Sequence, residues 1–306
     1  MRTGQPPIAA AASEDWQLGG RRLELSGPVQ VMGILNVTPD SFYDGGCHLS
    51  VDAAVARALQ MEDEGAAVID VGGESTRPPM YGGGDPVALD EELQRVLPVV
   101  AALREATSVP ISIDTTKAEV AHHCLQAGAD IINDTSALQD DDGMVTVAAD
   151  SGAPVILMHR RGIPSTMQCN TEYDNLFAEV LGFLEGRIDF AVAGGVDRGR
   201  IAVDPGIGFG KSVAGNLQLI GRLDELEALG CPVLVGASRK SFIWKTLGLT
   251  IEESLEGSLA AALISALAGA RILRVHDVAS TLRAVRMMEA IKRTALFADD
   301  DSSRPS

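Results

Sequence analysis

Aromatic residues are scarce in this 306-residue chain, at 4% of the total, and there are only four cysteines. Because 46% of the residues are hydrophobic, a sizeable core is possible, but it must be mainly aliphatic. The cysteines, Cys47, Cys124, Cys169 and Cys231, lie far apart and form no Cys-x-x-Cys pair. We therefore expect neither a disulfide framework nor a thiolate zinc site, and a reduced cytosol is the simplest location.

Long apolar runs and basic clusters are also missing. The longest apolar stretch, residues 257–270, is shorter than the roughly 20 residues that a membrane-spanning helix needs. The first residues show no basic segment followed by an apolar block, so we expect no export signal. The net charge of −17 repels nucleic-acid phosphates and anionic membranes. These features predict a cytoplasmic protein that binds neither nucleic acid nor membrane.

Eight short apolar runs alternate with helical patterns between two polar ends, residues 1–12 and 297–306, which we expect to be disordered tails. The runs are residues 29–38, 67–72, 110–115, 131–135, 154–159, 201–204, 232–237 and 272–276, and clear helical stretches include 51–64, 90–104, 117–127 and 173–193. Near-continuous apolar runs are typical of strands buried on both faces. Eight such units predict a single-domain (β/α)8 barrel over residues 13–296, with a doubly wound open sheet as the alternative.

Polar side chains follow almost every predicted strand. They are Asn36 and Thr38, Glu74 to Arg77, Asp114 and Thr115, Asn133 and Asp134, His159, Asp204, Ser238 to Lys240, and Arg274 and His276. Any single Asp or Asn among them can be a helix cap. Helix capping does not explain the whole set, because caps do not need Arg, His or Lys. In a barrel these strand ends meet on one rim, where active sites are built.

Arg274 and His276 alternate on the last strand, so their side chains leave the same face. Two adjacent cationic donors need a partner when they are buried. Phosphate oxygens suit a planar guanidinium and an imidazole, so a bound anion is one interpretation. An ion pair with a carboxylate is the other.

A second set of strand-end residues combines acceptors and donors: Asp114, Asn133, Asp204 and Lys240. Such a set matches the edge of a flat heterocycle that carries N–H groups and a carbonyl. The alternative is a carboxylate–lysine ion pair that closes the barrel mouth. The turn at residues 206–212 resembles a phosphate-binding P-loop, but Pro205 stands where that motif needs glycine, so we interpret it as a glycine-rich turn that lets a ligand approach the backbone.

At these residues the chain resembles the dihydropteroate synthases of the pterin-binding family. The similar segments are residues 32–42, 70–78, 113–115, 132–134, 157–159, 204–211, 236–240 and 274–277, within a stretch from about residue 16 to about residue 293. One departure is Pro79-Met80-Tyr81-Gly82, where the family more often has a shorter connection after Arg-Pro-Gly.

The resemblance implies a (β/α)8 barrel, usually a homodimer, and a transferase of an alkyl group other than methyl. Its reaction joins 4-aminobenzoate to 7,8-dihydropterin-6-ylmethyl diphosphate, giving 7,8-dihydropteroate and diphosphate, with Mg2+ as cofactor, and such enzymes are sulfonamide targets. A non-catalytic or methyltransferase-type pterin-binding module is the alternative. Such a module has no use for a diphosphate site or a Ser-Thr-Arg-Pro loop, and both are present here.

The resemblance also implies a role for each matching residue. For the pterin, Asp204, Asn133 and Asp114 should accept from ring nitrogens and the amino group, Lys240 should donate to the carbonyl side, and Met158, Phe209 and Gly236 should line the pocket. For the diphosphate, Arg274, His276 and Asn36 should hold it, with Mg2+ near Asn36. Two loops, one with Asp40 and one with Thr76, Arg77 and Pro78, should fold over the site, and Ser238 should help to bind aminobenzoate. The residues expected to act in catalysis are Asp40, Thr76, Arg77, Lys240, Arg274 and His276.

Overall fold

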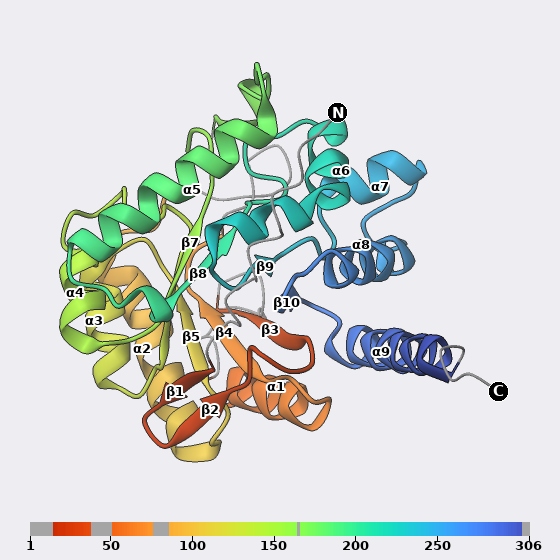
Figure 1. The fold of residues 1–306 in the computed structure, drawn as a ribbon. Helices are drawn as coiled ribbons and strands as arrows, with labels where there is room; N and C mark the ends of the chain where they lie inside the picture. The colour runs from red at the N-terminus through yellow and green to blue at the C-terminus, as the bar shows by residue number, and fades with distance from the viewer. Residues whose placement is uncertain (1–14, 38–50, 76–85, 164–165, 302–306) are drawn as a thin grey trace.

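The computed structural model describes residues 15–37, 51–75, 86–163 and 166–301, with side chains up to residue 294 (Figure 1). Eight parallel strands form one sheet in the order β8-β7-β6-β5-β4-β3-β10-β9. They are β3 (Gln30–Asn36), β4 (Val68–Gly72), β5 (Ile111–Asp114), β6 (Ile131–Asp134), β7 (Val155–Met158), β8 (Ile201–Asp204), β9 (Leu234–Val235) and β10 (Ile272–Val275).

The two edges of this sheet meet. Val203 in β8 forms a parallel bridge with Val233, and its N–H donates to the Pro232 carbonyl at 2.9 Å. The sheet is therefore a nearly closed barrel. This confirms the predicted (β/α)8 barrel, and the alternative of a doubly wound open sheet is wrong.

Helices outside the barrel connect successive strands, as Figure 1 shows. They are α1 (Val51–Asp63), α2 (Leu89–Ala106), α3 (Ala118–Gln126), α4 (Met144–Ser151), α5 (Leu176–Ala193), α6 (Val213–Gly221), α7 (Ser241–Leu247), α8 (Leu255–Leu267) and α9 (Val278–Asp301), with short 3-10 helices η3 (Met167–Cys169), η4 (Arg198–Arg200) and η5 (Leu223–Leu229). Local signals set several ends: the Asn175 side chain accepts from the N–H of Ala178 to begin α5, and Gly152 ends α4 at φ 66°. Helix α9 continues to Asp301, beyond residue 296, and residues 1–12 lie outside the described part of the chain.

An antiparallel hairpin that the sequence did not predict closes the N-terminal end of the barrel. It consists of β1 (Trp16–Leu18) and β2 (Arg21–Leu23). One buried cluster joins the hairpin to the barrel. It contains Trp16, Leu18, Leu23 and Leu25 together with one residue from each of seven barrel strands: Met32, Val68, Ile131, Ile156, Ala202, Leu234 and Ile272. The Trp16 indole N–H donates to the Gly199 carbonyl at 2.9 Å. This apolar plug leaves the opposite end of the barrel as the place for a site.

Side chains inside the barrel change from apolar to polar along the strands. Successive residues of a strand point to opposite faces, so every second residue shares a face. Two residues after Val68, Ile131, Ala202 and Ile272 of the apolar cluster come Asp70, Asn133, Asp204 and Arg274. The layer above the plug is therefore polar, and it faces the C-terminal ends of the strands.

Among the described helices, none has the length and apolar character needed to cross a membrane.

Candidate active site

Arg274 in β10 is held by two carboxylates from other strands. Its Nε donates to Asp70 Oδ2 at 2.6 Å and its Nη2 donates to Asp114 Oδ2 at 2.6 Å. Burial acts to lower the pKa of Arg274, but Asp70 and Asp114 outweigh it and raise that pKa above its usual value. The predicted alternative, an ion pair with a carboxylate, therefore exists for one edge of the guanidinium, which has further N–H groups on Nη1 and Nη2.

Asp114 and Asn133 lie next to this pair. Burial raises the pKa of Asp114 to about 7, although Arg274 pulls it down. The Asn133 side chain is 3% exposed, and its Nδ2 donates to Asp70 Oδ2 at 3.2 Å. Asp70, Asp114, Asn133 and Arg274 therefore form one polar group that spans four strands, with Asp70 and Asn133 buried and the other two partly buried.

Asp204 and Lys240 complete the second predicted set, to which Asp114 and Asn133 also belong. Asp204 Oδ1 accepts from the Gly206 N–H at 2.7 Å, and Lys240 Nζ donates to the Ile207 carbonyl. Burial raises the pKa of Asp204 while Lys240 opposes this, and burial lowers the pKa of Lys240 to about 7 while Asp204 opposes it. No ion pair within 4.0 Å joins these two described residues, so the predicted alternative of a closing ion pair is wrong.

A small apolar cluster adjoins Lys240. Met158, at the end of β7, packs with Met167 and Phe209, and all three are buried. Lys240 Nζ lies 4.0 Å from the centroid of the Phe209 ring. The cluster gives the site one apolar wall beside its hydrogen-bonding groups, as a flat ring requires.

In the glycine-rich turn, backbone atoms of other residues occupy the side-chain direction of two glycines. A Cβ on Gly206 would lie 1.8 Å from the His159 carbonyl oxygen, and one on Gly210 would lie 2.6 Å from the Arg161 carbonyl oxygen. Lys211 Nζ is buried, where it donates to the Gly206 carbonyl at 2.9 Å and contacts His159 Nδ1 at 2.9 Å. Glycine is therefore required at these two positions by the close approach of other backbone, and Lys211 fixes the turn that carries Phe209.

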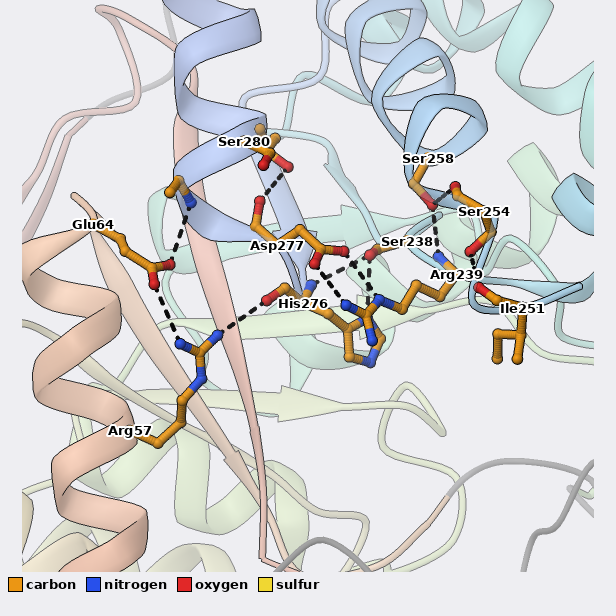
Figure 2. Close-up of polar contacts among 12 residues, drawn as sticks. Arg57, Glu64, Ser238, Arg239, Ile251, Ser254, Ser258, His276, Asp277 and Ser280 are labelled. Carbon is orange, nitrogen blue, oxygen red and sulfur yellow. Dashed lines mark hydrogen bonds and ion pairs between the residues drawn. The ribbon is translucent and has the colours of Figure 1, made fainter.

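His276 lies beside Ser238 at the rim (Figure 2). The Nδ1 atom of His276 is 3.1 Å from Ser238 Oγ, and this oxygen also accepts from the His276 N–H at 3.3 Å. Arg239 is paired with Asp277, through Nε to Oδ2 at 3.0 Å and Nη2 to Oδ1 at 2.6 Å. On the other side, Arg57 donates to the His276 carbonyl at 3.3 Å. The turn that carries His276 is thus held from both sides.

Two further predicted residues, Gly236 and Asn36, lie near Arg274 and Asp114 in the fold. A Cβ on Gly236 would lie 3.8 Å from the Cβ of Arg274, so Gly236 borders the guanidinium-bearing side chain. Asn36 ends β3 and is half-buried; it pairs in register with Gly72, which pairs with Asp114. Four predicted residues, Asp40, Thr76, Arg77 and Pro78, lie outside the described residues, as does the departure at Pro79-Met80-Tyr81-Gly82.

Asp70 is a site residue that the sequence interpretation missed. Its signal was present, because it is a single carboxylate between Ile69 and Val71 in an otherwise apolar strand. A fully buried carboxylate needs partners, and here they are Arg274 and Asn133. Met167 was also missed, because it comes from η3 and no strand pattern points to it.

The geometry defines a class of protein, a (β/α)8 barrel whose C-terminal strand ends bring carboxylates and an amide together with lysine and arginine side chains. The sequence profile described as pterin binding enzyme matches residues 32–276. The dihydropteroate synthase of Escherichia coli (strain K12) is 48% identical over 271 residues, which cover 89% of this chain and 94% of the relative.

Solved structures agree with the sequence match. The crystal structure of Yersinia pestis dihydropteroate synthase with a sulfonamide drug complex has a TM-score of 0.85 at 45% identity and covers 92% of this chain and 100% of that chain. The Xanthomonas albilineans dihydropteroate synthase with 4-aminobenzoic acid has a TM-score of 0.85 at 46% identity and covers 92% and 98%. The chain belongs to the pterin-binding enzymes and, within them, to the dihydropteroate synthase family.

Proposed function

We propose that this chain is a dihydropteroate synthase, which joins 4-aminobenzoate to 7,8-dihydropterin-6-ylmethyl diphosphate and releases diphosphate. The observation that carries the proposal is the shared polar layer, in which Asp204 and Asn133 lie in the same barrel mouth as Arg274. The field of Asp204 also acts on the pKa of Arg274, so the two parts of the site are close. A site with both parts can hold a ring and an anion at once.

The pterin is proposed to bind through its N–H groups to Asp204, Asn133 and Asp114, with its carbonyl toward Lys240. These are acceptors and a donor in the arrangement that the ring edge needs. Met158 and Phe209 supply the apolar contact with the ring face. Lys240 has a lowered pKa of about 7, so it loses its proton more easily than an exposed lysine does and still donates through its N–H groups.

Diphosphate is proposed to bind at the donors of Arg274 that Asp70 and Asp114 leave free, and at His276. Mg2+ fits here, because this ion keeps several waters and is held by substrate phosphates and one or two protein oxygens. The amide oxygen of Asn36 would be such a ligand, and the described residues contain no group of three or more His, Cys, Asp or Glu that would form a protein-only site. When bound, the ion would neutralise charge on the leaving diphosphate.

The reaction is proposed to proceed without a covalent intermediate on the enzyme. The bond between the methylene carbon and the diphosphate oxygen breaks, and its electron pair leaves with diphosphate. The pterin ring delocalises the positive charge left on the carbon, while Arg274 and His276 stabilise the negative charge on the leaving oxygen. The amine nitrogen of 4-aminobenzoate then forms the new C–N bond and loses a proton. This neutral amine needs positioning more than a strong base.

Positioning of 4-aminobenzoate is proposed to involve Ser238 and the loop with Thr76, Arg77 and Pro78. The loop with Asp40 is proposed to cover the site together with it and to keep water from the cationic carbon. Sulfonamides, as analogues of 4-aminobenzoate, are proposed to compete for the same place.

Release of diphosphate tests the function. Purified protein with the pterin diphosphate, 4-aminobenzoate and Mg2+ should release diphosphate and form dihydropteroate in equal amounts, and omission of 4-aminobenzoate should stop dihydropteroate formation. A protein that binds the pterin but releases no diphosphate would instead be a non-catalytic or methyltransferase-type pterin-binding module.

A homodimer is proposed through the surface of α6, α7 and α8, which lie together in Figure 1. Exposed apolar side chains of this surface, which we call the α6–α8 face, are Leu217, Leu247, Leu249, Ile251, Ile264 and Leu267. Helix α8 has one charged residue, Glu256, among its 13 residues. A helix without a polar face is normally buried, so a second copy of the chain is the proposed cover.

Light scattering after size exclusion tests the dimer. The wild type should have twice the mass of the 32.1-kDa chain. Ile264→Asp should give a monomer, whereas Phe190→Asp, at an exposed apolar residue of α5, should leave the dimer intact. A monomeric wild type would contradict the proposal.

A cytoplasmic location is proposed as well, and fractionation of cells that produce the protein tests it.

A further inference from the structure

We propose that Asp70 is a positioning residue that fixes the orientation of both Asn133 and Arg274, and so aligns the pterin part of the site with the diphosphate part. The inference rests on the proposed function. Asp70 lies at the middle of β4, is 0% exposed, and is not needed to contact either substrate in this role.

The first step concerns the amide of Asn133. An ionised carboxylate only accepts hydrogen bonds, so the group of Asn133 that faces Asp70 must be its NH2. The Nδ2 atom lies 3.2 Å from Asp70 Oδ2 and 3.4 Å from Oδ1. The amide oxygen is therefore directed to another side and is available as an acceptor for a ring N–H. Without Asp70, the two ends of the amide could exchange places and offer the wrong polarity to the pterin.

The second step concerns the guanidinium of Arg274. Nε and Nη2 form one edge of this flat group, and Asp70 and Asp114 each accept from one of these atoms at 2.6 Å. The edge is fixed by two carboxylates from neighbouring strands, so the remaining N–H groups have a fixed direction as well. Asp70 alone contacts both Asn133 and Arg274 among the hydrogen bonds of the described residues.

The third step concerns the surroundings of Asp70. Ser112 is its register neighbour on β5 and is also 0% exposed. Its hydroxyl has no hydrogen-bond partner among the described residues. Ser112 therefore has the same burial and the same register position as Asp70, but no side-chain hydrogen bond to Asn133 or Arg274, and it provides a matched control.

The test compares three variants in their affinity for 6-hydroxymethylpterin and in turnover. Asp70→Asn should weaken pterin binding about 10- to 100-fold, the range that corresponds to one charge-assisted hydrogen bond, and should lower kcat as well. Asn133→Asp alone should also weaken binding, because it places two carboxylates together. The double variant Asp70→Asn/Asn133→Asp should bind the pterin at least about 10-fold more tightly than Asn133→Asp, since an amide at position 70 again donates to an acceptor at position 133.

The control Ser112→Ala should bind the pterin as the wild type does. Unchanged pterin affinity in a folded Asp70→Asn would overturn the proposal, and so would a double variant that binds no better than Asn133→Asp. If Asp70→Asn does not fold, the comparison of the double variant with Asn133→Asp still decides. Wild-type turnover separates the two ideas: an inactive wild type contradicts the proposed function, whereas an active wild type with unaffected Asp70 variants contradicts only this inference.

Discussion

The protonation of Asp114 should make the stability of the apo protein depend on pH in a way that Asp114→Asn removes. Burial raises the pKa of Asp114 from 3.8 to about 7. The folded state therefore binds this proton more tightly than the unfolded state does. The stabilising contribution is complete below pH 3.8 and is lost as the pH rises through about 7.

The size of the effect follows from the same values. Each pKa unit corresponds to about 1.36 kcal/mol, so the shift from 3.8 to about 7 sets an upper limit of about 4 kcal/mol. Between about pH 5 and about pH 8, the free energy of unfolding of the wild type should lose up to about 3 kcal/mol of this stabilising contribution. An asparagine at position 114 does not titrate. The free energy of unfolding of Asp114→Asn, relative to the wild type, should therefore increase with pH over this range.

Urea unfolding at several pH values measures this difference. Asp189→Asn, at an exposed position of α5, controls for the loss of a carboxylate. The reasoning would be refuted if the free energies of unfolding of Asp114→Asn and the wild type differed by a constant amount from about pH 5 to about pH 8. That result would mean that Asp114 does not titrate in this range.

Four further changes separate the parts of the molecule. Asp204→Asn should abolish binding of 6-hydroxymethylpterin, whereas His276→Gln should lower kcat about 100-fold or more and leave that binding nearly intact, as calorimetry and turnover would measure. Trp16→Ala should lower the free energy of unfolding by about 3–5 kcal/mol in urea without changing pterin affinity, because Trp16 lies at the closed end of the barrel. Chelation of Mg2+ should stop diphosphate release, and restored Mg2+ should recover it, with no effect on calorimetric binding of the bare pterin.

Much of the barrel could be predicted from the sequence because buried parallel strands are marked by near-continuous apolar runs. All eight predicted runs contain a strand of the barrel. The hairpin of β1 and β2 could not be predicted in the same way, because its two strands have three residues each and its stability comes from packing under the barrel. Trp16 carries no local signal for that packing.

Site residues could be predicted from the sequence where the type and spacing of a side chain indicate its role. Arg274 and His276 on alternate positions indicated a common face; in the structure Arg274 lies in β10 and His276 comes directly after its last residue, Val275. The partners were not predictable, because which carboxylate reaches Arg274 depends on strands far apart in the sequence. Asp70 is 204 residues from Arg274 and Asp114 is 160 residues from it. The pairing of Arg239 with Asp277 likewise needs the folded turn.

A crystal structure with bound 7,8-dihydropterin-6-ylmethyl diphosphate is the most direct test of the central claim that one barrel mouth holds both parts of the substrate. The account predicts that the ring N–H groups lie within hydrogen-bond distance of Asp204 and Asn133, and that diphosphate oxygens lie within that distance of Arg274 and His276. A substrate whose diphosphate lies away from His276 while its ring is at Asp204, or whose ring lies outside the pocket, would contradict it.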